Sequence, residues 1–238
     1  MNAPAAEPPT RAVFFDVDFT LIYPGPMFQG VGYRDFCARY GMDVDPGRFE
    51  RAVAAASTVL DARGGVYDPE VFIAYTRRII EGMGGSGAEV DHAARDIYDE
   101  WSACHHFEMY DDVPDVLRRL HAAGLKIGLI SNTQRCLSSF QKHFELEGLF
   151  AVAVSSADHG YMKPHPSIFE AALTAIDARP EESVMVGDSY AHDIEGARGA
   201  GMRAVLVARS GRIDPHPSDV PVISSLRELP ALLCTSAR

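Results

Sequence analysis

Residues 12–20 read AVFFDVDFT, a short apolar run that ends in two aspartates, Asp16 and Asp18. Successive apolar residues of this kind fit a strand that is buried on both faces, as strands of a parallel sheet are. Similar runs recur at residues 126–131, 151–155, 183–187 and 203–208. We therefore predict that residues 12–17 form one strand of a parallel sheet, with the four later runs as its neighbours.

Helical patterns alternate with these runs. Residues 112–123, 166–176 and 193–200 each carry apolar side chains at helical spacing. Pro166 suits the first turn of a helix, and Gly124 suits the position just after a helix end. This alternation predicts an α/β fold, in which a Rossmann-like parallel sheet has helices on both faces and right-handed crossovers.

A different region separates the first strand from the rest of the sheet. It shows helical patterns at residues 32–40, 46–62, 69–81 and 88–103, divided by Gly, Pro and Asp clusters, and no convincing strand. We predict an inserted all-helical domain over residues 23–110. Residues 1–22 and 111–238 then form the catalytic core, with the Ala- and Pro-rich residues 1–11 as a disordered tail.

Composition narrows the class of protein. The 238 residues include 22 Lys and Arg against 33 Asp and Glu, which gives a net charge of −11. Such a chain is a poor partner for nucleic acid or for an anionic membrane surface. No apolar run approaches the roughly 18 residues that span a bilayer. Four scattered cysteines without CxxC spacing fit a reducing compartment. We expect a cytoplasmic protein that acts on a small molecule, and its oligomeric state stays open.

Polar side chains follow four of the predicted strands. An i, i+2 spacing in extended chain points Asp16 and Asp18 to the same side. Further candidates come after the later strands: Ser131, Asn132, Lys163, Asp188 and Asp193. An isolated pair of aspartates after a strand is usually a turn. Ligands of open α/β sheets bind beyond the carboxyl ends of the strands, so this combination predicts one active site there.

Four segments resemble the motifs of the haloacid dehalogenase-like hydrolase superfamily. They are FFDVDFT at 14–20, LISN at 129–132, YMKPHPSIF at 161–169 and VGDSYAHDIEGARGAGM at 186–202. The resemblance covers nearly the whole chain, because the helical insert stands where the family carries its C1-type cap. One residue departs from the pattern: Phe19 occupies a position that is usually Gly in the phosphatase members. We expect the tight turn there to be slightly altered.

The resemblance implies a role for each matching residue. Asp16 would be the nucleophile and Asp18 the general acid and base, while Thr20, Ser131, Asn132 and Lys163 would bind the phosphoryl group. Asp16, Asp18, Asp188 and Asp193 would hold Mg²⁺. The chemistry agrees, because several carboxylates and a phosphate can converge only around cations, and Mg²⁺ prefers oxygen ligands. The predicted function is that of a Mg²⁺-dependent phosphatase for a small phosphorylated metabolite.

Single residues argue for or against other functions within the same family. A dehalogenase would lack the acid at Asp18, and a phosphonatase of this family would need a cap lysine, whereas residues 23–110 contain no Lys. A phosphomutase shares all four motifs and stays open, as does a non-catalytic module that binds a phosphate ligand. His192 lies between two acids of the fourth motif, where it can contact the site or cap a helix.

Overall fold

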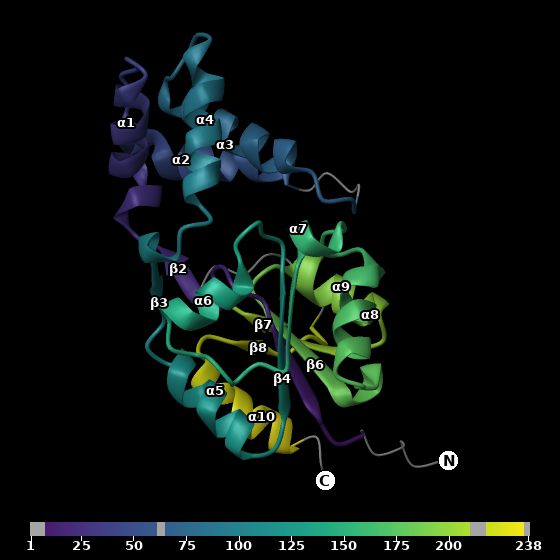
Figure 1. The fold of residues 1–238 in the computed structure, drawn as a ribbon. Coiled ribbons are helices and arrows are strands. Elements are labelled where there is room, and N and C mark those ends of the chain that lie inside the picture. Colours follow the sequence, from purple (N-terminus) through teal and green to yellow (C-terminus); the bar gives the residue numbers. More distant parts are fainter. Residues whose placement is uncertain (1–7, 61–64, 210–217, 236–238) are drawn as a thin grey trace. The chain divides into compact units, whose positions relative to one another are not determined.

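The computed structural model describes residues 8–60, 65–209 and 218–235 (Figure 1). The chain divides into two compact units. The core unit comprises Met1–Tyr23 and Met109–Arg238, and the inserted unit comprises Pro24–Glu108.

A six-stranded parallel sheet forms the centre of the core unit, which confirms the predicted α/β class. Its strands lie in the order β5-β4-β1-β6-β7-β8. They are β1 (Ala12–Phe15), β4 (Lys126–Ser131), β5 (Val152–Ser155), β6 (Ser183–Gly187), β7 (Arg203–Val207) and β8 (Val222–Ile223). The first five match the predicted runs within two residues. The two-residue strand β8 was not predicted, because it is too short to show a pattern.

The direction in which strands are added to the sheet reverses at β1. The chain runs from β1 outward through β4 and β5, and then returns to β6 on the other side of β1. In register, Phe15 pairs with both Leu129 of β4 and Val186 of β6. β1 therefore ends directly before Asp16, whereas β6 continues one residue beyond this level to Gly187 and β4 two residues to Ser131. A reversal of strand order of this kind marks the ligand site of an open α/β sheet.

Helices cover both faces of the sheet (Figure 1). On one face, Phe14 and Met185 pack in a buried cluster with Ile168, Phe169 and Ile194. This cluster joins the sheet to α8 (Pro166–Ala175) and α9 (Glu195–Gly199). The opposite face carries α5 (Val113–Ala122) and α10 (Leu229–Thr235).

Short elements complete the core unit. They are α6 (Leu137–His143), α7 (Ser156–His159), the 3₁₀ turns η5 (Pro180–Glu182) and η7 (Leu226–Glu228), and the π-turn η6 (Tyr190–Ile194). The π-turn begins the helical segment three residues before the predicted start at Asp193. The region predicted to lack strands has one at each end, because β2 (Ile22–Pro24) and β3 (Phe107–Met109) pair as a separate two-stranded sheet.

The inserted unit is helical between those strands. Its α-helices are α1 (Gly30–Arg39), α2 (Phe49–Ala56), α3 (Pro69–Met83) and α4 (Glu89–Glu100), with 3₁₀ turns η1 (Pro26–Phe28), η2 (Pro46–Arg48), η3 (Ser57–Val59) and η4 (Cys104–His106). The pattern at 46–62 resolves into η2, α2 and η3, and its last two residues lie outside the described part. Among the described helices, none is long and apolar enough to cross a membrane.

The structure describes the last four residues, 8–11, of the predicted N-terminal tail. Residues 1–7 lie outside, but the Arg11 amide donates to the Glu182 carbonyl at 2.8 Å. The Thr10 hydroxyl accepts from Arg203 at 2.7 Å. Thr10 and Arg11 therefore belong to the packed core unit, and the prediction of a tail up to Arg11 was wrong for these two residues.

Phe19 keeps the backbone conformation that glycine would adopt. Its φ angle is 63°, in the left-handed region, and its amide donates to the Ile22 carbonyl at 2.6 Å. The turn after Asp18 is thus closed in spite of the phenyl ring, which is 44% exposed. A bulky residue rarely takes this conformation, which costs an L-residue roughly 1–2 kcal/mol.

We expect replacements of Phe19 to reveal this backbone strain. The free energy of unfolding should be about 1–2 kcal/mol lower for Phe19→Val than for Phe19→Gly, because a β-branched residue fits the left-handed region worst. Chemical denaturation of both variants measures this difference. The same pair of substitutions at Asp177, an exposed residue with φ of 50°, is a positive control that should show a similar difference. Equal stability of the two Phe19 variants would contradict the expectation.

Candidate active site

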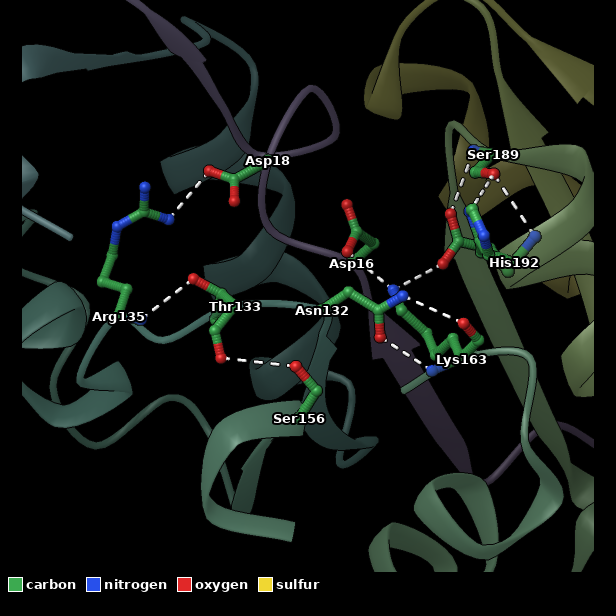
Figure 2. Close-up of polar contacts among 10 residues, drawn as sticks. Asp16, Asp18, Asn132, Thr133, Arg135, Ser156, Lys163, Ser189 and His192 are labelled. Carbon is green, nitrogen blue, oxygen red and sulfur yellow. Dashed lines mark hydrogen bonds and ion pairs between the residues drawn. The ribbon is translucent and has the colours of Figure 1, made fainter. Parts of the chain in front are cut away.

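Asp16 is the first residue beyond β1, and its position is fixed by the sheet. Its amide donates to the Val186 carbonyl at 2.9 Å, so the parallel ladder continues one residue past the strand. Asp16 follows the strand that lies between β4 and β6, and the residue is only 7% exposed. Asp16 Oδ1 accepts a hydrogen bond from Lys163 Nζ at 2.7 Å (Figure 2).

Lys163 comes from the loop before α8 and is held by Asn132. The Asn132 side chain accepts from the Lys163 amide at 2.7 Å and donates to the Lys163 carbonyl at 3.0 Å. This two-point contact places the buried ammonium group beside Asp16 (Figure 2). Asn132 was predicted to bind the phosphoryl group through its amide, and the structure shows that its side chain orients the lysine.

Asp193, in the π-turn after β6, shares the contact with Lys163. Its Oδ1 accepts from Lys163 Nζ at 2.5 Å, and its Oδ2 accepts from the Ser189 amide at 3.0 Å. The carboxylate passes close over Gly187, where a Cβ atom would lie 2.2 Å from Asp193 Oδ2. Only glycine at the end of β6 leaves room for this approach.

Three of the predicted metal ligands are brought together. Among the described residues, Asp16, Asp188 and Asp193 can each offer a carboxylate oxygen with all three atoms within 4.8 Å of one another. Lys163 is paired with two of them. Three acidic groups thus lie around one ammonium group, and all of these residues except the half-buried Asp188 are buried.

The crowding of carboxylates changes their proton affinity. Burial raises the pKa of Asp16 to about 7, with repulsion from Asp193 adding to the effect and Lys163 opposing it. Burial, with repulsion from Asp16 and Asp193, also raises the pKa of Asp188 well above its usual value. Burial alone would lower the pKa of Lys163, but attraction to Asp16 and Asp193 outweighs it and raises that pKa. Lys163 is therefore charged, and the site favours additional positive charge.

The donor set fits a hard divalent cation. All three groups are carboxylates, the ligands that Mg²⁺ accepts, and they lack the nitrogen or sulfur that zinc sites prefer. Burial is the main cause of the raised pKa values of Asp16 and Asp188, and a divalent ion would relieve the repulsion that adds to it. Asp16, Asp188 and Asp193 are the residues that would hold it.

The structure places the Asp18 side chain elsewhere. Its Oδ1 accepts from Arg135 Nη1 at 2.8 Å, and Asp18 does not belong to the group of three carboxylates (Figure 2). The prediction of Asp18 as a metal ligand is therefore not supported for its side chain. Arg135 was missed by the sequence analysis, although it lies only four residues after Ser131.

The two hydroxyl residues predicted to bind phosphate differ in position. Ser131 is the last residue of β4, buried at the carboxyl end of the strand next to β1. Thr20 is completely buried, and its hydroxyl has no hydrogen-bond partner among the described residues. The Thr20 carbonyl accepts from Arg209 at 2.7 Å. Thr20 thus lies inside the loop after Asp18, where its hydroxyl is closed off from solvent.

His192 fits the helix-capping alternative. Its Nδ1 lies 3.0 Å from the Ser189 hydroxyl, which also accepts from the His192 amide at 3.3 Å (Figure 2). Ser189 and His192 close the first turn of the segment that carries Asp193. The pair therefore stabilises the π-turn.

A family model agrees with the geometry. The model described as haloacid dehalogenase-like hydrolase matches residues 10–201, which include both halves of the site. The chain belongs to the haloacid dehalogenase-like hydrolase family. Its carboxylate cluster, Lys163 and the Asp16–Asp18 pair lie within the matched region.

Curated relatives of this haloacid dehalogenase-like hydrolase carry related names. "Haloacid dehalogenase-like hydrolase domain-containing protein 3" of Danio rerio is 29% identical over 239 residues, covering 94% of this chain and 97% of the relative. Pyrophosphatase PpaX of Bacillus mycoides (strain KBAB4) is 36% identical over 115 residues, which are 47% of this chain and 53% of PpaX. The match to PpaX thus spans about half of that protein.

A solved structure has the same fold. The HAD-hydrolase YfnB from Bacillus subtilis, whose orthorhombic crystal form is bound to magnesium, aligns with a TM-score of 0.73 at 18% identity. The alignment covers 95% of this chain and 99% of YfnB. At this level of identity the likeness concerns the fold alone.

We expect Asp188→Asn to stabilise this hydrolase when metal is removed. In the unfolded chain the carboxylates ionise near pH 3.8, whereas in the folded protein Asp16 and Asp188 ionise at higher pH. Between these values the folded state binds more protons, so the two groups lower stability as the pH rises. The substitution removes one charge, and its gain should grow from near zero at pH 4 to about 1–3 kcal/mol at pH 8.

Thermal denaturation in excess chelator at several pH values measures this gain. Asp177→Asn removes one exposed carboxylate from the same unit and should show no such growth with pH. In Mg²⁺, the wild type should gain stability at pH 8 and Asp188→Asn should gain less. A lower melting temperature for Asp188→Asn in chelator at pH 8 would contradict the expected repulsion.

Proposed function

We propose that this chain is a Mg²⁺-dependent phosphatase that hydrolyses a small phosphate monoester through an aspartyl-phosphate intermediate. The observation that carries the proposal is the contact of Asp16 with Lys163 beside two further carboxylates, at the end of the central strand. A buried carboxylate next to a buried ammonium group supplies both a nucleophile and a partner for an anionic substrate. The names of PpaX, a pyrophosphatase, and of a phosphatase from Thermococcus onnurineus with the same fold support hydrolysis of a bond to phosphorus.

Asp16 carries out the first step. One of its oxygens attacks phosphorus, and the bond from phosphorus to the ester oxygen breaks, so the phosphoryl group is transferred to Asp16. Asp18 gives a proton to the departing oxygen, which leaves as an alcohol. Lys163 offsets the negative charge on the phosphoryl oxygens, and Ser131 offers its hydroxyl to one of them.

The second step returns the enzyme to its starting state. Asp18 takes a proton from a water molecule, the water oxygen bonds to phosphorus, and the bond from phosphorus to Asp16 breaks. Inorganic phosphate leaves, Asp16 is again a free carboxylate, and Asp18 again carries the proton that it gave up in the first step. Splitting the displacement into two steps lets one carboxylate serve as acid and then as base.

Mg²⁺ held by Asp16, Asp188 and Asp193 would keep Asp16 ionised and would offset charge on the phosphoryl oxygens. Asn132 contributes by holding Lys163 in place. The Ser189 amide does the same for Asp193.

A turnover assay with an aryl phosphate tests the proposal. Purified protein should release inorganic phosphate in Mg²⁺, and excess chelator should abolish the release. A panel of alkyl phosphates, nucleotides, sugar phosphates and inorganic pyrophosphate would then define the substrate. Transfer of the phosphoryl group to a second hydroxyl of the substrate in place of water would assign a phosphomutase.

Two results would overturn the proposal. Release of halide from a 2-haloacid in the presence of chelator would assign a dehalogenase. Tight binding of a phosphorylated ligand, without turnover of any compound in the panel, would assign a binding module.

A further inference from the structure

Arg135 is buried at the edge of the site in a way that packing alone does not explain. Arg135 belongs to the loop between β4 and α6, and it is only 1% exposed. Arginine is almost never fully buried without a charged partner, because removing its charge from water is costly. That partner is Asp18, which lies 117 residues earlier in the sequence.

The contact between the two side chains is specific. Arg135 Nη1 donates to Asp18 Oδ1 at 2.8 Å, and the Asp18 side chain is 15% exposed (Figure 2). One carboxylate oxygen of Asp18 is therefore occupied by the arginine. The other oxygen, Oδ2, is the one that remains for exchange of a proton.

A chain of hydrogen bonds fixes the backbone of Arg135. Its amide donates to the Thr133 hydroxyl at 3.0 Å, which closes a tight turn directly after β4. The Thr133 carbonyl accepts from the Ser156 hydroxyl at 3.4 Å and from the Ala157 amide at 3.3 Å (Figure 2). The base of the arginine is thus tied to the ends of both β4 and β5.

The two buried cations of the site divide the carboxylates between them. Lys163 pairs with Asp16 and Asp193, and Arg135 pairs with Asp18. Asp18 is thereby held apart from the group that would bind metal. A flexible carboxylate beside three others and a cation could turn toward the cation, and a rigid guanidinium contact prevents this rotation.

We propose that Arg135 is a positioning residue that fixes the Asp18 carboxylate for proton transfer to and from the ester oxygen and water. The inference rests on the proposed function, because it gives Arg135 no role except through Asp18. Loss of Arg135 should act on the steps that use Asp18 and should leave the binding of the phosphoryl group nearly unchanged.

The test compares leaving groups. Arg135→Met should lower kcat for an alkyl phosphate by about 10- to 100-fold, a part of the 10²–10⁴-fold effect typical of acid–base catalysis, with KM changed less than about threefold. Transfer from an aryl phosphate to Asp16 should fall much less, because that leaving group needs little protonation. Arg135→Lys, which keeps the charge, should recover part of the alkyl activity.

A double-mutant cycle makes the test strict. In an Asp18→Asn background, adding Arg135→Met or Arg135→Lys should cost less than about threefold in kcat for the alkyl phosphate, because the group that Arg135 positions is already gone. Arg203→Met removes a partly buried arginine at the opposite end of the sheet, beside Thr10, and should show no dependence on the leaving group.

The outcomes separate this inference from the proposed function. Equal losses on alkyl and aryl phosphates in the rate of phosphoryl transfer to Asp16, or additive losses in the cycle, would overturn the role of Arg135 while turnover by the wild type still supported a phosphatase. If Arg135→Met does not fold, the cycle with Arg135→Lys decides by the same criterion. Absence of phosphate release by the wild type would instead reject the proposed function.

Discussion

Asp16→Asn should abolish turnover of every phosphate ester and should leave no phosphoenzyme, whereas Asp18→Asn should trap one. An amide is a very weak nucleophile, so the loss of Asp16 should cost about 10⁴-fold or more in kcat. The amide introduced by Asp18→Asn cannot protonate a leaving oxygen, and alkyl phosphates should therefore suffer most. With an aryl phosphate, transfer to Asp16 should still proceed, but the second step should stall because no base activates water.

Labelling with a radioactive aryl phosphate distinguishes the two variants. Acid-quenched Asp18→Asn should carry label that hydroxylamine removes, as expected for an acyl phosphate, and Asp16→Asn should carry none. Asp158→Asn, which alters an aspartate of α7 bonded to Ser155, is a control that should behave as the wild type. Label on Asp16→Asn, or turnover by it at the wild-type rate, would show that the roles of the two carboxylates are assigned wrongly.

Lys163→Met should destabilise the core unit strongly as well as inactivate the enzyme. The ammonium group is buried and bonded to Asp16 and Asp193, so its removal leaves three crowded carboxylates without a cation. Breaking a buried ion pair from one side typically costs about 3–5 kcal/mol. The pKa of Lys163 is raised in the folded protein, so its contribution is complete below about pH 10 and the full loss should appear at pH 7.

Chemical denaturation in chelator measures this loss. It should shrink as the pH falls toward 4, because Asp16 and Asp188 then take up protons. Mg²⁺ at pH 7 should restore part of it by supplying positive charge. Lys142→Met, in which an exposed lysine of α6 is replaced, is the matched control and should change stability by less than about 0.5 kcal/mol. A loss of that small size for Lys163→Met would mean that the carboxylates do not depend on the lysine.

The sheet and the location of the site could be predicted because both follow from local patterns. Each long strand is an apolar run between polar turns, and the burial of all four residues of β1 explains why its run has no alternation. Asp16, Ser131 and Asp188 lie directly at strand ends, so the order of the strands alone brings them to one edge. Lys163 and Asp193 lie further along the connections after their strands, where the sequence still marks them as candidates, and the resemblance to family motifs supplied their roles.

The remaining features depend on tertiary contacts that no local pattern carries. Asn132 turns toward the backbone of Lys163, 31 residues later, and Asp18 meets Arg135 across 117 residues. Thr20 is buried in the loop after Asp18, where its carbonyl is held by Arg209, a residue that follows β7 at the same edge of the sheet. An arginine four residues after Ser131 in a strongly acidic chain was the one visible signal for the partner of Asp18.

The central position of β1 also sets the order in which the chain can fold. Residues 12–15 pair with β4 and β6, which lie more than a hundred residues later in the sequence, so the sheet is dominated by contacts of long sequence separation. Contacts of this kind form slowly. The helices of the inserted unit instead pack mainly on their neighbours in sequence, as α2 does on α3 and α3 on α4. During synthesis, the inserted unit can therefore fold first, while the strand that carries Asp16 must wait until β6 has left the ribosome.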